Sequence, residues 1–271
     1  MMTRIVIAGA AGRMGQALIR CSLAMDDVEL VGATEHPAHE ALGRDAGEIV
    51  GSEVRTGVQL SADLGSVLAD ADVLIDFTYH SVVPQNATLA ARLKRAVVIG
   101  TTGLTQEESM MVDKAANAVP IVWAPNMSLG VNLLFAMSKR AAAVLGTGYE
   151  VRIDDTHHIH KLDAPSGTAL RLGEKVADGA GVRFEDVYLH DEGGVMPSYP
   201  SGRIVICSHR EGEVVGDHTV AFDGLGERVE LTHHAKSRDA FALGALHAAK
   251  WVCAQRPRLY DMQDVLGLRD V

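Results

Sequence analysis

Short apolar runs alternate with amphipathic stretches through the first half of the chain. Apolar and β-branched runs predict strands, and stretches with apolar residues along one side predict helices. The predicted strands cover residues 3–8, 28–34, 72–78, 96–99 and 120–123, with a further short strand near Val58. The predicted helices cover residues 13–25, 63–69, 82–94 and 105–117. This alternation predicts an α/β fold with a Rossmann-type, doubly wound parallel sheet.

The pattern changes after residue 129. Helices are predicted over 130–145, 167–177 and 238–254, and strands over 149–156, 213–222 and 227–232, the last two joined by a glycine-containing turn. We therefore expect a first domain over 1–129 and a second, α+β domain with a mixed sheet over 130–238. The C-terminal segment 239–271 is expected to return to the first domain, because the termini of a domain often lie close together.

Charge and cysteine content narrow the functional classes. The 271 residues carry a formal net charge of −10, which argues against nucleic-acid binding because that requires a basic surface. The three cysteines, Cys21, Cys207 and Cys253, lie far apart and form no C-x-x-C pair, as is typical of a reducing, cytoplasmic setting. The N-terminus lacks signal-peptide features, and no apolar stretch of about 18 residues predicts a membrane span.

A glycine-rich turn follows the first predicted strand. Its sequence, Gly9-Ala10-Ala11-Gly12-Arg13-Met14-Gly15, differs by one residue in spacing from the usual dinucleotide-binding motif. Small residues still allow a tight turn, and the amides of the following helix can bind a pyrophosphate. A purely structural turn is the alternative. Glu35 ends the second strand, where an acidic residue can accept the ribose 2′-hydroxyl; otherwise it is an ordinary surface carboxylate.

Two further strands end in polar turns. These are Gly100-Thr101-Thr102 and Ala124-Pro125-Asn126-Met127. Ligands of open parallel sheets bind at the carboxyl ends of the strands, so both turns are expected to border the nicotinamide. Each could instead serve only as a turn or a helix cap.

Three histidines and a lysine fall within five residues at the end of a predicted strand. His157, His158, His160 and Lys161 combine groups that transfer protons near neutral pH with a fixed cation, as a reaction on a small carboxylate requires. The helix that begins around Ser166-Gly167-Thr168 offers a second anion site at its N-terminus. A zinc site and a plain polar loop are the alternatives. Zinc is disfavoured because neither an H-E-x-x-H pattern nor paired cysteines occur.

The segment from His157 to Ala169 resembles the signature of the dihydrodipicolinate reductase family. The turns at Gly9–Gly15, Gly100–Gly103 and Ala124–Ser128 resemble the same family in the same order. The resemblance implies that His157 donates and accepts a proton, that Lys161 is a second proton donor, and that His158, Gly167 and Thr168 contact a small dicarboxylate substrate. It implies dinucleotide contacts from a larger set: Gly9, Ala10, Ala11, Gly12, Arg13, Met14, Glu35, Gly100, Thr101, Thr102, Ala124, Pro125, Asn126 and Met127.

The family resemblance also implies a role for each domain. Domain 1–129 would bind NAD(P)H, and domain 130–238 would bind the substrate and form a homotetramer. The implied reaction is reduction of 4-hydroxy-tetrahydrodipicolinate in lysine and diaminopimelate biosynthesis, in the cytoplasm, with no metal. Such chemistry suits the residues, because hydride addition to a conjugated imine builds negative charge that a lysine can stabilise.

The sequence departs from the family at the cofactor end. His36 follows Glu35 where many members have an arginine that can pair with the 2′-phosphate of NADPH. We therefore expect NADH to be preferred, with NADPH still usable. Tyr79 also stands where relatives can have arginine, and Arg238 could bind a substrate carboxylate or form only a surface salt bridge.

Two other functions remain as alternatives. One is a different NAD(P)-dependent reductase of a small dicarboxylate, against which the His157–Ala169 string argues. The other is a redox sensor that binds NADH, which should carry a basic helix-turn-helix that the sequence does not show.

Overall fold

The computed structural model describes residues 2–53, 55–196 and 199–269. Contacts within the chain divide it into two compact units. Unit 1 comprises Met1–Ser128 and Arg238–Leu266. Unit 2 comprises Leu129–Ser237 together with the described residues after Leu266. The C-terminal helix therefore packs with the N-terminal part of the chain.

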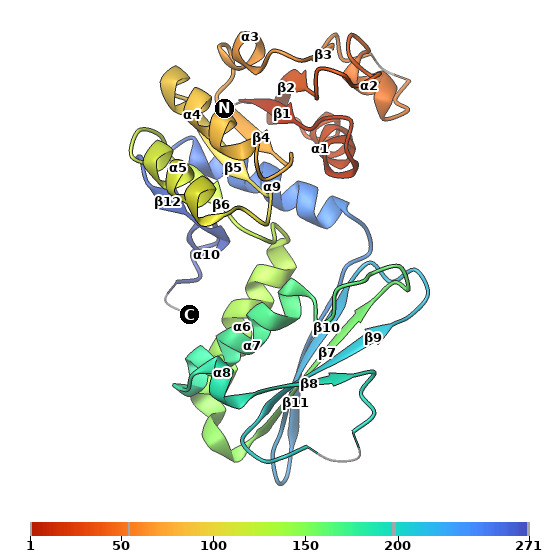
Figure 1. Cartoon of the computed structure of the whole chain (residues 1–271), viewed down its shortest axis with the longest axis vertical. Coiled ribbons are helices and arrows are strands. Elements are labelled where there is room, and N and C mark those ends of the chain that lie inside the picture. The colour runs from red at the N-terminus through yellow and green to blue at the C-terminus, as the bar shows by residue number, and fades with distance from the viewer. Residues whose placement is uncertain (1, 54, 197–198, 270–271) are drawn as a thin grey trace. The chain divides into compact units, whose positions relative to one another are not determined.

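Unit 1 contains a seven-stranded sheet in which every pair of neighbouring strands is parallel (Figure 1). The strands lie in the order β12-β6-β5-β4-β1-β2-β3. From β1, the chain adds β2 and β3 on one side of the sheet and then β4, β5, β6 and β12 on the other, as in a doubly wound nucleotide-binding sheet. The predicted Rossmann-type fold is confirmed. The strands are β1 (Thr3–Ala8), β2 (Val28–Thr34), β3 (Leu60–Ser61), β4 (Val73–Asp76), β5 (Ala96–Ile99), β6 (Ile121–Trp123) and β12 (Leu259–Tyr260).

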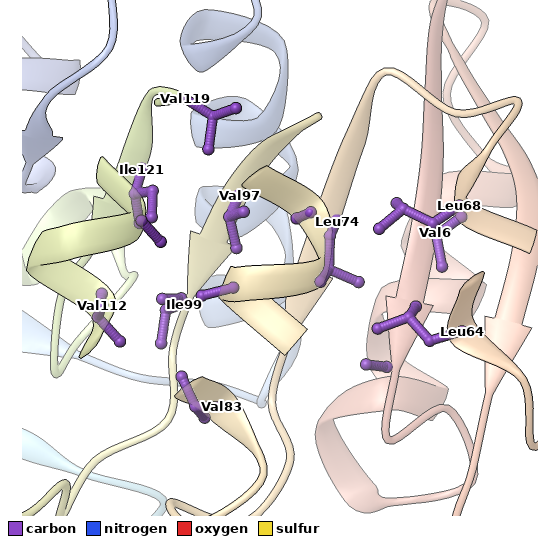
Figure 2. Packing of buried hydrophobic residues seen from close by; sticks show 14 of the residues in the cluster. Val6, Leu64, Leu68, Leu74, Val83, Val97, Ile99, Val112, Val119 and Ile121 are labelled. Atoms are coloured by element: carbon purple, nitrogen blue, oxygen red, sulfur yellow. The ribbon is translucent and has the colours of Figure 1, made fainter. Parts of the chain in front are cut away.

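Helices pack on this sheet through apolar side chains. They are α1 (Arg13–Leu23), α2 (Ala46–Ile49), α3 (Leu64–Leu68), α4 (Val83–Leu93), α5 (Gln106–Ala116), α9 (Asp239–Val252) and α10 (Met262–Val265). Figure 2 shows Leu74, Val97 and Ile99 of the central strands meeting Val83 of α4 and Val112 of α5. All five are fully buried. Strands buried on both faces require near-continuous apolar runs, which is why residues 72–78 and 96–99 could be recognised from the sequence.

Unit 2 places helices against one face of a mixed five-stranded sheet of order β11-β10-β7-β9-β8. Strands β7, β9 and β8 run parallel, and β10 and β11 are antiparallel to their neighbours. The predicted α+β architecture is confirmed. The elements are α6 (Leu129–Leu145), a 3₁₀ turn η1 (Gly146–Gly148), β7 (Glu150–His157), α7 (Gly167–Ala180), α8 (Phe184–Val187), β8 (Tyr188–Glu192), β9 (Ile204–Arg210), β10 (Asp217–Asp223) and β11 (Arg228–His234).

Several boundaries differ from the sequence-based expectations. The strand expected near Val58 forms two residues later, at Leu60–Ser61. The strand expected from residue 213 begins at Asp217, because Glu211 to Val214 form a turn. Strands β8 and β9 were not predicted, although Ile204–Cys207 is a run of four apolar residues that typifies a buried strand.

Helix α6 and the following turn are apolar enough to resemble a membrane span. Leu129–Gly148 covers 20 residues with a mean hydropathy of 1.2, which the sequence analysis did not anticipate. Val131, Leu134 and Phe135 are buried in the core of unit 2, so core packing accounts for much of this apolar character. The helix also carries the exposed Lys139 and Arg140.

Candidate functional site

The turn between β1 and α1 leaves backbone amides available to an anion. Gly12 caps α1 without a side-chain hydrogen bond, so the first helical amides lack a side-chain acceptor. A Cβ on Gly15 would lie 2.2 Å from the Gly9 carbonyl oxygen and 2.6 Å from Ala10 Cα. Only glycine therefore allows α1 to begin so close to β1. An uncapped helix N-terminus with the exposed Arg13 beside it suits a pyrophosphate.

Glu35 is held in place at the end of β2. Its Oε2 accepts the Ala11 amide at 2.9 Å, and its Oε1 accepts the His36 amide at 2.9 Å. The carboxylate is thus oriented before any ligand binds, and each oxygen retains a further lone pair for a ribose hydroxyl. The hydrogen bond from the Ala11 amide therefore connects Glu35, the predicted acidic residue, to the predicted glycine turn.

A pocket of about 450 Å³ brings together two predicted cofactor segments of unit 1 and a third segment that was not predicted to contact the cofactor. Gly12–Met14, Phe77–His80 and Gly100–Thr102 line it, at the carboxyl ends of β1, β4 and β5. The buried Asp76 shapes this edge by accepting the Thr78 amide at 2.9 Å and hydroxyl at 2.6 Å. Burial raises the pKa of Asp76 above its usual range, although the hydrogen bonds oppose that shift.

The fourth predicted cofactor segment lies apart from this pocket. Ala124 and Met127 are buried, Pro125 is exposed, and Asn126 Oδ1 accepts the Ser128 amide at 2.9 Å. The segment follows β6 and connects the parallel sheet to α6.

In unit 2, His157 ends β7 and lies against a buried carboxylate. Its Nδ1 is 3.1 Å from Asp155 Oδ1, in an oblique approach rather than an aligned hydrogen bond. His218 Nε2 lies 3.3 Å from the same oxygen, and Ser166 donates to Asp155 from both its amide and its hydroxyl. Burial alone would raise the pKa of Asp155, but these partners outweigh burial and hold it well below its usual range.

Lys161 lies in the loop after β7 and is largely buried. Its Nζ is 2.9 and 2.8 Å from the two carboxylate oxygens of Asp163, and this contact lowers the pKa of Asp163. Arg210 donates to the carbonyl oxygens of Lys161 and Asp163, which holds the loop backbone. An ammonium group has three N–H donors, so one remains for a further oxygen ligand.

The predicted substrate residues do not share one cavity. A pocket of about 780 Å³ is lined by Lys161 and by residues of β7, β8 and β9, including Asp154, His209 and Arg210, but not by His157, His158, Gly167 or Thr168. Gly167 and Thr168 form the first turn of α7, as predicted. Ser166 caps that turn by accepting the Ala169 amide at 3.1 Å.

Asp155, His157 and His218 also form a possible cation site. One ligand atom from each lies within 4.8 Å of the others, and all three residues are buried. The Asp155 carboxylate, however, already accepts two hydrogen bonds from Ser166. A metal would compete with these bonds, so the donor set fits a hydrogen-bonded network better than a metal centre.

Sequence reasoning missed Asp155, Arg210 and His218 as parts of this site, and it named Ser166 only as the start of a helix. Asp155 has a weak sequence signal, since it is an acidic residue on the same face of a predicted strand as His157. His218 has none, because its strand pairs with β7 only in the folded chain.

The fold and these sites define a two-domain protein in which a dinucleotide-binding sheet accompanies a mixed-sheet domain, as in nicotinamide-dependent oxidoreductases. The family model described as dihydrodipicolinate reductase, N-terminus, matches residues 3–127, and the one described as dihydrodipicolinate reductase, C-terminus, matches residues 130–266. The chain belongs to the dihydrodipicolinate reductase family.

Relatives match over nearly the full length. The 4-hydroxy-tetrahydrodipicolinate reductase of Anaeromyxobacter dehalogenans (strain 2CP-1 / ATCC BAA-258) is 47% identical and covers 99% of both chains. That of Syntrophotalea carbinolica is 45% identical over 99% of this chain and 100% of its own. Dipicolinate-bound dihydrodipicolinate reductase from Paenisporosarcina sp. TG-14 is 28% identical, with a TM-score of 0.78 over 97% of this chain and 99% of that one.

Proposed function

We propose that this chain reduces 4-hydroxy-tetrahydrodipicolinate to tetrahydrodipicolinate in lysine and diaminopimelate biosynthesis. In the balanced reaction NAD(P)H gives a hydride, one proton is taken up, and the 4-hydroxyl group of the substrate leaves as water. The observation that carries the proposal is the position of the family's His–Lys segment, His157 to Lys161, at the carboxyl end of β7 beside the N-terminus of α7. The dihydrodipicolinate reductase from Paenisporosarcina sp. TG-14 covers 97% of this chain, and its structure contains bound dipicolinate, a planar ring with two carboxylates.

Unit 2 supplies the groups for binding and protonation. Lys161 and the first turn of α7, at Gly167 and Thr168, offer positive potential to the substrate carboxylates. His158 adds a polar contact. Bound NAD(P)H supplies the hydride. As charge then develops on the ring nitrogen and its conjugated carbons, Lys161 stabilises it and His157 donates the proton.

Unit 1 would bind the dinucleotide through the β1–α1 turn from Gly9 to Met14, with Glu35 on the adenosine ribose. Gly100–Thr102 and Ala124–Met127 would border the nicotinamide, as the edge of a parallel sheet does in this fold. These contacts follow from the family and from the position of each turn at a strand end.

NADH is the proposed preferred cofactor. The carboxylate of Glu35 is fixed by two amides and would repel a 2′-phosphate. His36 offers little compensation, because its Nδ1 accepts the Ala38 amide at 3.2 Å. Nδ1 can accept this hydrogen bond only through its lone pair, so that nitrogen is already engaged within the turn. NADPH remains usable, since Arg13 is exposed beside the same turn.

The protein is proposed to act as a cytoplasmic homotetramer assembled through unit 2, with neither nucleic acid nor membrane as a partner. Its formal charge of −10 disfavours an anionic partner surface. Light scattering of the purified chain tests the assembly, and a monomer at micromolar concentration would refute it.

The activity is tested by following the absorbance of NADH with the purified chain and 4-hydroxy-tetrahydrodipicolinate generated in the assay. We expect turnover that dipicolinate inhibits competitively with the substrate. A His157→Gln variant that still binds NADH, measured by fluorescence titration, provides the matched control. A folded wild-type chain that binds NADH but does not oxidise it with this substrate would refute the proposal.

A further inference from the structure

Asp155 is a carboxylate completely removed from solvent, with a relative exposure of 0%. Burying an ionised carboxylate is costly unless its partners compensate. Here the partners come from three elements: His157 from β7, Ser166 from the start of α7 and His218 from β10. The reaction outlined above does not use Asp155 directly, so its burial beside His157 calls for a separate explanation.

We propose that Asp155, with His218, is a positioning pair that holds His157 as the Nδ1–H tautomer and leaves Nε2 as the nitrogen that exchanges the proton with substrate. The inference rests on the proposed role of His157. The Asp155 carboxylate accepts hydrogen bonds from Ser166 and so acts only as an acceptor. His157 Nδ1 lies 3.1 Å from it in an oblique approach, and at that distance the carboxylate favours an N–H over a second lone pair.

The surroundings of His157 favour the same assignment for Nε2. This nitrogen faces the backbone of Gly216, where a Cβ would lie 3.1 Å away. An added side chain at this position would press against Nε2, and glycine avoids that contact. The His157 side chain retains 11% of its surface exposed. One nitrogen thus faces a buried acceptor, and the other lies beside a glycine that has no side chain.

His218 contacts the same carboxylate oxygen of Asp155 as His157 does. Its Nε2 is 3.3 Å from Asp155 Oδ1 and 3.5 Å from the Ser166 hydroxyl, and its ring meets that of His157 edge-on with centroids 5.3 Å apart. His218 therefore contacts both the carboxylate and the imidazole ring. Because Ser166 also caps α7, the same carboxylate connects the proton-transferring ring to the proposed substrate-binding turn.

The tautomer is measured by ¹⁵N NMR of histidine side chains in the full-length protein, at a pH where the His157 ring is neutral. The His157→Gln variant identifies the His157 signals by their loss. We expect Nδ1–H in the wild type. In Asp155→Asn, the amide group can donate to Nδ1, so we expect a shift to Nε2–H. A wild-type ring in the Nε2–H form overturns the proposal, whether or not any variant folds.

Kinetics provide the second readout. Asp155→Asn is expected to lower kcat by about 10²-fold, the scale of a misplaced acid–base group, with the KM for NADH changed by less than about twofold. Asp155→Glu, which restores a carboxylate, should recover the Nδ1–H signal and part of kcat. A folded Asp155→Asn enzyme with unchanged kcat would overturn the positioning role.

Asp191→Asn is the matched control. Asp191 is another buried acid of unit 2, held by Tyr199 and by the amides of Val195 and Met196, and none of these hydrogen bonds involves His157. Its loss should lower stability but leave the His157 tautomer unchanged. Tautomer changes in both variants would mean general loosening and would contradict a specific role.

Two further outcomes are distinguishable. If EDTA or added Zn²⁺ changes the His157 signals of the protein as purified, the cluster holds a cation and the proposal is wrong. If the wild type shows the Asp155-dependent tautomer but does not reduce the substrate, the proposed reaction fails while the contact between Asp155 and His157 stands.

Discussion

Replacing Gly15 with alanine tests how the cofactor turn is built. The added Cβ would lie 2.2 Å from the Gly9 carbonyl oxygen and 2.6 Å from both the Cα and the carbonyl oxygen of Ala10. All three atoms belong to the backbone, so no side-chain rotation can relieve the overlap. Helix α1 must move away from β1, or the turn itself must deform.

The magnitude follows from this overlap. Overpacking a well-packed region costs about 1–3 kcal/mol, and a clash with backbone on three atoms belongs at the upper end. For a unit of this size, about 3 kcal/mol lowers Tm by about 6–12 °C. The same displacement moves the first amides of α1, so NADH affinity should fall together with stability.

The assay is thermal unfolding by circular dichroism without cofactor, followed by NADH titration at a temperature where the variant is folded. Gly12→Ala is the graded comparison, because its Cβ would meet only the Gly9 carbonyl oxygen at 3.2 Å. Gly148→Ala, with nothing within 4 Å of the added atom, should leave Tm unchanged. A Gly15→Ala protein as stable as Gly148→Ala, with normal NADH affinity, would refute the reasoning.

Three other predictions follow from the two units. His36→Arg should raise kcat/KM for NADPH relative to NADH by about tenfold, because a permanent cation with several N–H donors replaces a ring whose Nδ1 is engaged by the Ala38 amide; an unchanged ratio would contradict this. His157→Gln and Lys161→Ala should each lower kcat by about 10²-fold or more with folding intact, whereas near-wild-type rates would exclude both roles. The lowered pKa of Asp155 contributes stability that is complete above the unfolded-state value of about 3.9 and is lost as pH falls below it. In urea unfolding, the stability difference between wild type and Asp155→Asn should therefore narrow from about pH 7 to about pH 3, and a constant difference would show that the charge is not responsible.

The parallel sheet of unit 1 could be predicted closely from the sequence. Strands at residues 3–8, 28–34 and 96–99 have the predicted bounds. The segment 96–99 is buried and apolar throughout, and the other two carry β-branched, apolar runs that end at a glycine or an acidic residue. In unit 2 the signals are less uniform. Strand β8 is mostly polar and was missed, and β9 was missed although Ile204–Cys207 is an apolar run. The strand expected from residue 213 was placed too early, because the residues before Asp217 form a turn.

The candidate site also has parts that the sequence predicted and parts that it did not. Glu35 was chosen for its place at the end of β2, and the structure connects it to Ala11 through a hydrogen bond. The 450 Å³ pocket joins Gly12–Met14 with Gly100–Thr102, as expected of adjacent strand ends. The second pocket contains Lys161 without His157, a separation that no spacing along the chain could reveal.

The sequence by itself predicted the strands β1, β2, β4, β5 and β6 of unit 1, the glycine turn and the His157–Lys161 segment, because each depends on residues that are neighbours in the chain. The short elements α2, β12 and α10 were not predicted. Tertiary structure alone decided which side chains surround the predicted segments. Asp155, Ser166 and His218 meet because β10 pairs with β7 and α7 starts beside the end of β7. A local pattern specifies which face a residue occupies, whereas its partners depend on pairings between distant segments.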